Sequence, residues 1–206
     1  MPNWCENTIT LSHKDPAMID RVVKGQEGLL MEFLPTPKEL TETVAGFMGE
    51  DKRAAHEAQQ RANIEKYGYK DWYDWNVANW GTKWDVGGDD GMITEDGPNA
   101  LRMSFDSAWS PPIPAMEHFM DLGFKVKLIY WESGMCYCGL FDENGDDYYD
   151  YSNMTAKEFA EEINPEIDEC MCIIENLEMW EEENKDEVQE WYEDGVEKRG
   201  LDPHTS

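Results

Sequence analysis

Basic residues are scarce in this chain. Its 206 residues include 17 Lys and Arg against 45 Asp and Glu, which gives a formal net charge of −28 at pH 7. So acidic a chain repels phosphate backbones and anionic membrane surfaces. We therefore expect no direct nucleic-acid or membrane partner, and favour a basic surface on another protein. The alternative is that the acidity serves solubility alone.

Long apolar runs are also missing. The first residues, Met1–Cys5, contain neither a basic segment nor an apolar stretch, so we expect no signal peptide and no transmembrane span. Five cysteines are an odd number for a chain without an export signal, which predicts reduced thiols in a cytoplasm.

Familiar catalytic and cofactor motifs do not occur. There is no G-x-S-x-G, no Walker loop, no G-x-G-x-x-G and no HExxH. The pairs Cys136/Cys138 and Cys170/Cys172 are spaced more closely than structural zinc sites usually require. We interpret them as ordinary thiols, one pair on a strand and the other on a helix, with a metal site as the alternative. No catalytic residue, cofactor or metal is predicted.

What the chain does have is a dense aromatic stretch between Trp72 and Pro112. We interpret it as a secondary core, in which Trp80→Ala or Trp84→Ala would cost about 3–5 kcal/mol of stability. The alternatives are an anchor site for a peptide or protein and a ligand pocket beside the sheet. The stretch supplies these candidate residues: Trp80, Lys83, Trp84, Asp85, Asp106 and Trp109.

Alternating and helical apolar patterns predict an α+β fold. The expected strands cover residues 4–13, 28–34, 99–109, 124–132, 134–141 and 147–151. Helices are expected from Asp15–Pro16 and from Pro114, because proline is favoured in a first helical turn. This order matches the split βαβ, or ferredoxin-like, antiparallel sheet.

Two further segments complete the expected organisation. A helical and aromatic insertion occupies about residues 36–98 and begins with a capping box formed by Thr36 and Glu39. The domain then spans residues 1–151, and an acidic helical extension covers 152–206, starting at a second capping box of Thr155 and Glu158.

The acids of the sheet hairpin and of the extension are the candidate partner-binding residues. They are Asp146, Asp147, Asp150, Glu178, Glu181, Glu182, Glu183, Asp186 and Glu187.

Four blocks occur in one order: Met1–Asn7, Phe33–Pro37, Asn79–Asp85 and Phe105–Pro112. In these blocks, residues 1–150 resemble the YubB-like family of ferredoxin-like domains from bacteriophages and conjugative plasmids. The resemblance implies a ferredoxin-like shape without an iron–sulfur cluster and a place in a host cell cytoplasm, and it carries over no catalytic residue.

Together these features suggest a non-enzymatic interaction protein of a phage or mobile element. It would act as a DNA mimic that blocks a nucleic-acid-binding host defence protein or transcription factor. Two alternatives stay open: a small ligand-binding domain or enzyme with a pocket at Trp80–Trp109, and an assembly component of the phage particle. The sequence leaves the oligomeric state undecided.

Overall fold

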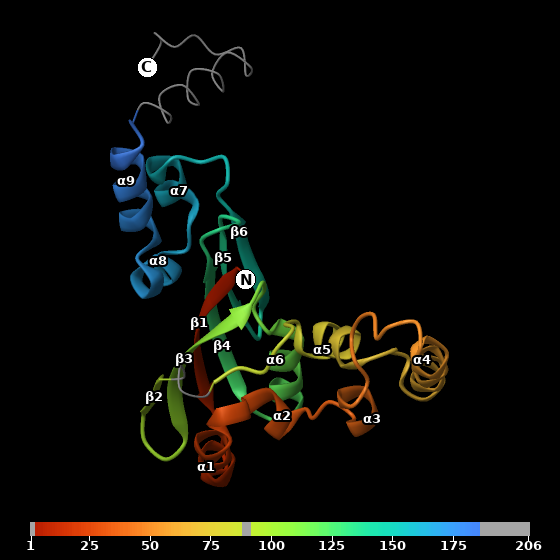
Figure 1. The fold of residues 1–206 in the computed structure, drawn as a ribbon. Coiled ribbons are helices and arrows are strands. Elements are labelled where there is room, and N and C mark those ends of the chain that lie inside the picture. Colours follow the sequence, from red (N-terminus) through yellow and green to blue (C-terminus); the bar gives the residue numbers. More distant parts are fainter. Residues whose placement is uncertain (1–2, 88–91, 186–206) are drawn as a thin grey trace. The chain divides into compact units, whose positions relative to one another are not determined.

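The computed structural model describes residues 3–87 and 92–185 (Figure 1). They form two compact units that divide between Tyr148 and Tyr149, whereas the sequence placed the boundary after residue 151. The first unit combines a sheet with helices, and the second is mostly helical. The predicted α+β class is therefore confirmed.

The sheet has six strands in the order β2-β3-β1-β4-β5-β6. The pairings of β2 with β3, β3 with β1, β1 with β4 and β4 with β5 are antiparallel. Five of these strands lie within a few residues of their predicted positions. The strands are β1 Trp4–Ser12, β2 Met92–Glu95, β3 Ala100–Ala108, β4 Lys125–Glu132, β5 Tyr137–Asp142 and β6 Gly145–Asp150.

One face of this sheet forms the core of the first unit. Ile9 of β1 lies opposite Met103 of β3 and Leu128 of β4, and all three side chains are fully buried. The core is completed by apolar side chains from five helices. These helices are α1 Pro16–Lys24, α2 Leu29–Phe33, α3 Lys38–Thr41, α5 Trp72–Trp80 and α6 Ile113–Asp121. The predicted cap of α1 is confirmed, because the Asp15 carboxylate accepts from the backbone N–H of Ala17.

The predicted strand over residues 28–34 is wrong. A 3₁₀ turn η1, Gln26–Gly28, leads into helix α2 there. A short apolar run does not distinguish a strand from a helix by its period alone. The helix is favoured because its free N–H groups find a distant acceptor: Asp85 accepts from Leu30 and Met31, at 2.7 and 3.0 Å.

The edge position beside β3 belongs instead to β2, Met92–Glu95. This strand lies within the segment that the sequence analysis assigned to a helical and aromatic insertion over residues 36–98. The helices between α2 and β2 are α3 Lys38–Thr41, α4 Arg53–Tyr67 and α5 Trp72–Trp80. Gly81 ends α5; it has a left-handed φ of 82°, which glycine adopts without strain.

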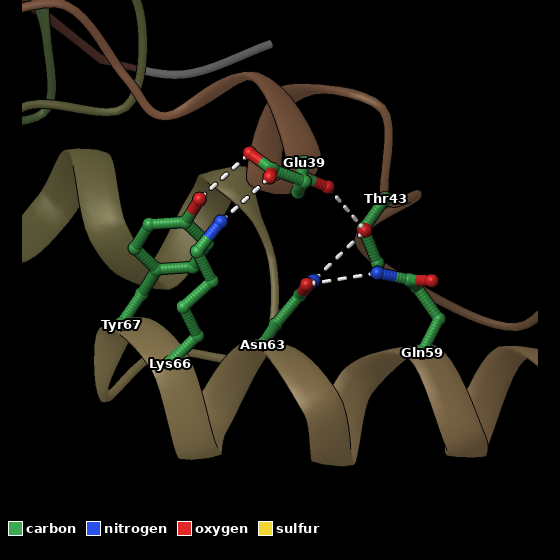
Figure 2. Close-up of polar contacts among 6 residues, drawn as sticks. All are labelled: Glu39, Thr43, Gln59, Asn63, Lys66 and Tyr67. Carbon is green, nitrogen blue, oxygen red and sulfur yellow. Dashed lines mark hydrogen bonds and ion pairs between the residues drawn. The ribbon is translucent and has the colours of Figure 1, made fainter.

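Polar contacts attach α4 to α3 (Figure 2). The only fully buried side chain of α4 is Asn63, which donates to Thr43 Oγ1 and to the backbone oxygen of Lys70, both at 2.9 Å. Glu39 accepts from Lys66 Nζ and Tyr67 OH, both at 2.7 Å. Since no apolar side chain of α4 is fully buried, hydrogen bonds and an ion pair hold this helix in place.

The predicted capping box at Thr36 and Glu39 does not form. The N-cap of α3 is Pro37, which provides no side-chain cap. Thr36 Oγ1 donates instead to Asn76 Oδ1 on α5, at 2.6 Å. Thr36 and Glu39 therefore bond to residues distant in sequence and not to each other: Thr36 to Asn76, and Glu39 to Lys66 and Tyr67 of α4.

The Glu39 carboxyl should titrate at unusually low pH. Its hydrogen bonds with Lys66 and Tyr67 lower its pKa from 4.5 to about 2. A depressed folded-state pKa means that this contribution to stability is present above about pH 4.5 and is lost as the pH falls towards 2. Carboxyl NMR titration should show the low midpoint, and Lys66→Met should move it upward. A midpoint near 4.5 in the native chain would contradict the contact.

The second unit contains α7 Ala156–Glu162, α8 Pro165–Met171 and α9 Ile173–Glu183. The predicted capping box of Thr155 and Glu158 is confirmed at the start of α7. The small core of the second unit includes Phe159, whose ring centroid lies 4.8 Å from that of Tyr151. Asp168 accepts from the backbone N–H of Ile174, which caps α9.

Candidate functional site

Exposed tryptophans from three distant parts of the first unit gather around Lys83. Trp84 and Trp109 flank the ammonium group, with Nζ 4.5 and 5.0 Å from their ring centroids. Trp4 packs against Trp84 at 5.8 Å. The exposed fractions of Trp4, Trp84 and Trp109 are 47%, 39% and 43%. We call Lys83 and these three residues the tryptophan cluster.

Hydrogen bonds fix the loop that carries Lys83 and Trp84. Thr82 Oγ1 donates to the backbone oxygen of Ala108 at 3.0 Å and accepts from its N–H at 3.1 Å. Ser110 Oγ donates to the backbone oxygen of Gly81 at 2.6 Å. The loop after α5 is thereby joined to the end of β3, which places Trp84 and Trp109 on either side of the lysine.

The backbone of Trp109 adopts a left-handed conformation, with φ of 71°. A bulky residue rarely takes this conformation, because it costs energy. The conformation persists only where contacts with the surroundings impose it. Here the Trp109 N–H donates to Asn3 O at 3.0 Å, and Tyr137 OH donates to Trp109 O at 2.6 Å. The indole is therefore held at the surface by its backbone contacts.

Lys83 differs from other lysines of the chain in its surroundings. Its ammonium group has no hydrogen bond or ion pair with any residue in the described part of the chain, whereas Lys66 and Lys70 each pair with a carboxylate. Tyr73 adds a third aromatic ring, 6.0 Å from Nζ. Aromatic faces attract a cation but leave its N–H donors unused.

Two of the predicted site residues make structural contacts instead. Trp80 is 3% exposed; its Nε1–H donates to Leu34 O at 2.8 Å, and its ring meets that of Trp75 edge-on. Asp85 caps α2, and burial raises the pKa of its carboxyl even though three backbone N–H groups donate to it. Neither side chain belongs to the tryptophan cluster.

Asp106 lies on β3, two residues before Ala108, the register partner of Trp4. It is opposite Glu6, the β1 residue two positions beyond Trp4. Burial, together with the charge of Asp106, raises the pKa of the Glu6 carboxyl. Among the predicted site residues, Lys83 contacts Trp84 and Trp109, whereas Trp80 and Asp85 make the structural contacts described above.

Trp4 was not predicted as a site residue. It begins β1, where nothing local marks it as functional. The β1–β3 register pairs Trp4 with Ala108, the residue before Trp109. Such a long-range pairing could have been found only by aligning both strands correctly.

Some of the predicted partner-binding acids accept hydrogen bonds within the chain, and others are exposed. Asp146 accepts from Tyr130 OH, Asp150 accepts from the N–H of Ser152, and Glu181 accepts from the N–H of Ala156. Asp147 also has an interaction. Asp186 and Glu187 lie outside the described residues.

The remaining predicted acids lie on α9 and are exposed: Glu178, Glu182 and Glu183. Met179 and Trp180 stand among them, with exposed fractions of 53% and 54%. Glu182 forms an ion pair with Lys185 at 2.5 Å. We call Glu178, Met179, Trp180, Glu182 and Glu183 the α9 surface; it combines acids with large apolar side chains.

The cysteines are not arranged as the sequence suggested. Cys136 lies in the turn before β5 with φ of 56°, so only Cys138 is on the strand. Cys172 has φ of 55° and separates α8 from α9. Cys5 is fully buried, which raises the pKa of its thiol to about 12, far from that of a reactive thiolate.

In residues 3–87 and 92–185, no three His, Cys, Asp or Glu side chains are grouped to hold a metal ion. No helix of that part of the chain is long and apolar enough to span a membrane.

One solved structure is similar to this chain, at low sequence identity. No family model and no curated protein matches the sequence. Among solved structures, the chain is similar to the crystal structure of protein api92 from Yersinia pseudotuberculosis, of family DUF1281. The two share 13% identity with a TM-score of 0.42, over 74% of this chain and 99% of that one.

Proposed function

We propose that this chain is a non-enzymatic interaction protein that binds a basic surface of a protein partner. The observation that carries the proposal is the α9 surface, in which exposed acids surround Met179 and Trp180. The net charge of −28 extends the same preference over the whole chain. Charge would guide the encounter, and the apolar side chains would supply affinity.

The spacing of the acids suits a basic partner. Glu178 and Glu182 are four residues apart on one helix, so their Cα atoms are separated by about 6 Å along its axis. Glu183 follows Glu182 directly and adds a third exposed carboxylate beside this pair. A partner that binds phosphates with Lys or Arg would meet these three carboxylates on one helix, which is the basis for proposing DNA mimicry.

Trp180 is the expected centre of affinity. Tryptophan is enriched among the interface residues whose truncation costs most. An exposed indole on a helix of this acidity has no evident structural purpose, since the buried residue of α9 is Ile173. The partner should therefore offer an apolar recess bordered by basic residues.

The origin that we propose is a phage or conjugative plasmid. The four sequence blocks support it. With η1 and helices α2 to α5 set aside, the chain order β1-α1-β2-β3-α6-β4 and the spatial order β2-β3-β1-β4 fit the ferredoxin-like domain that these blocks suggest. The chain would then act in the host cytoplasm. Its partner would be a host defence protein or transcription factor that binds nucleic acid.

Quantitative capture from bacterial lysate tests this proposal. The immobilised chain should retain a partner at low salt and release it at high salt. Substituting Glu178, Glu182 and Glu183 with Gln should weaken retention, and Trp180→Ala should weaken it by tenfold or more, since an anchor residue contributes at least about 2 kcal/mol.

The matched control carries the same change of charge elsewhere in the second unit. Glu161, Glu162 and Glu169 are exposed on α7 and α8, and their replacement with Gln should leave retention near the native level. If both triple variants lose retention equally, net charge alone explains the binding, and the position of the acids on α9 does not matter. The absence of any salt-sensitive partner would contradict the proposal.

A further inference from the structure

We propose that the tryptophan cluster binds a small ligand that joins a planar ring to a single anionic group. Nucleoside monophosphates and aromatic carboxylates are the two chemical sources of such a ligand. The ring would stack on an exposed indole, and the anion would accept hydrogen bonds from Lys83 Nζ. This site lies in the first unit and is independent of the α9 surface.

The aromatic surroundings of the Lys83 ammonium group are the first reason. Lys66 and Lys70 pair with carboxylates, and Lys24 is simply exposed on α1. Lys83 instead lies between Trp84 and Trp109 and makes no hydrogen bond within the described part of the chain. An anionic ligand would accept hydrogen bonds from the free N–H groups of Lys83 Nζ.

The rigid presentation of the indoles is the second reason. Trp109 is held at φ of 71° by bonds to Asn3 and Tyr137, and the loop before Trp84 is tied to β3 through Thr82. Backbone strain of this kind persists only where the surroundings enforce it, and it is concentrated at functional sites. A fixed aromatic surface loses little conformational entropy when a flat ligand binds.

Charge decides the class of ligand. The net charge of −28 repels a polyanion, so the cluster is unsuited to a nucleic-acid strand. A small ligand with one anionic group, a phosphate monoester or a carboxylate, faces far less repulsion than a polyanion and gains from a local cation. Planar rings match indole faces, because aromatic pairs stack favourably in offset arrangements. The ligand is therefore a single ring system with one anionic group.

The indole N–H signals of the native protein in an NMR titration provide the test. Adenosine monophosphate and indole-3-acetate are the anionic probes, and adenosine and indole-3-acetamide are their neutral counterparts. At least one anionic probe should shift the signals of Trp84 and Trp109, with an affinity about tenfold higher than that of its neutral counterpart. Which anion binds more tightly then identifies the source.

Two variants isolate the role of Lys83. Lys83→Met keeps the apolar stem and removes the charge, so it should abolish the preference for the anion while stacking persists. Lys24→Met removes the charge of an exposed lysine on α1 and should leave the preference unchanged. The proposal is overturned if no probe shifts these signals, or if the anion preference survives in Lys83→Met.

Discussion

Replacing Trp80 with alanine should lower the free energy of unfolding by about 3–5 kcal/mol. The side chain is 3% exposed, packs edge-on against Trp75 and donates its N–H to Leu34 O. Truncation would leave a cavity and an unpaired buried carbonyl oxygen, and both effects destabilise. Urea unfolding followed by circular dichroism measures the difference.

Trp84→Ala is the matched control for this prediction. The sequence alone led us to expect the same large cost at both positions. Trp84 is 39% exposed and touches mainly Trp4 and Lys83, so the cost should be about 1 kcal/mol. Similar losses in the two variants would contradict the division of the aromatic stretch into a buried part and an exposed part.

Replacing Asp85 with alanine should cost about 3 kcal/mol. Its carboxylate accepts from the N–H groups of Leu30, Met31 and Val86, and bonds to a charged group contribute about 1.5–3 kcal/mol each before desolvation is counted. Burial opposes this gain, which is why the expected loss is smaller than the sum. Hydrogen exchange at Leu30 and Met31 should accelerate most.

Asp85→Asn separates the hydrogen bonds from the packing. Its Oδ1 could still accept from Leu30 and Val86, but an amide nitrogen would face the N–H of Met31, where Oδ2 now accepts. The expected loss is about half that of Asp85→Ala. A fully stable alanine variant would show that α2 does not depend on this cap.

Local signals in the sequence predicted much of the fold. The alternation of Leu101, Met103 and Phe105 with polar residues identified β3, and Asp15–Pro16 identified the start of α1. Such patterns depend on neighbours in the chain, so they can be interpreted without the tertiary structure. The capping box at Thr155 belongs to the same class.

Errors arose where a distant residue decides the outcome. Residues 29–33 become helical with a cap supplied by Asp85, and Glu39 leaves its expected capping role for Lys66 and Tyr67. The strand β2 has only four residues, which is too short for a reliable alternating pattern. Each error reflects tertiary contacts that outweigh local preference.

The candidate site follows the same rule. The composition of the aromatic stretch indicated that it was special, but only the fold shows that Trp80 turns inward while Trp84 turns outward. Trp4 joins the tryptophan cluster through strand pairing that no local pattern predicts. The acids of the α9 surface were named from the sequence, whereas Met179 and Trp180 were not, because only the structure shows that they are exposed.

Competition with DNA tests the central proposal most directly. A partner captured by the native chain should be released by short duplex DNA, because both would occupy the same basic surface, and a Trp180→Ala chain should need less DNA for the same release. A partner that binds DNA and this chain together, without competition, would contradict DNA mimicry by the α9 surface.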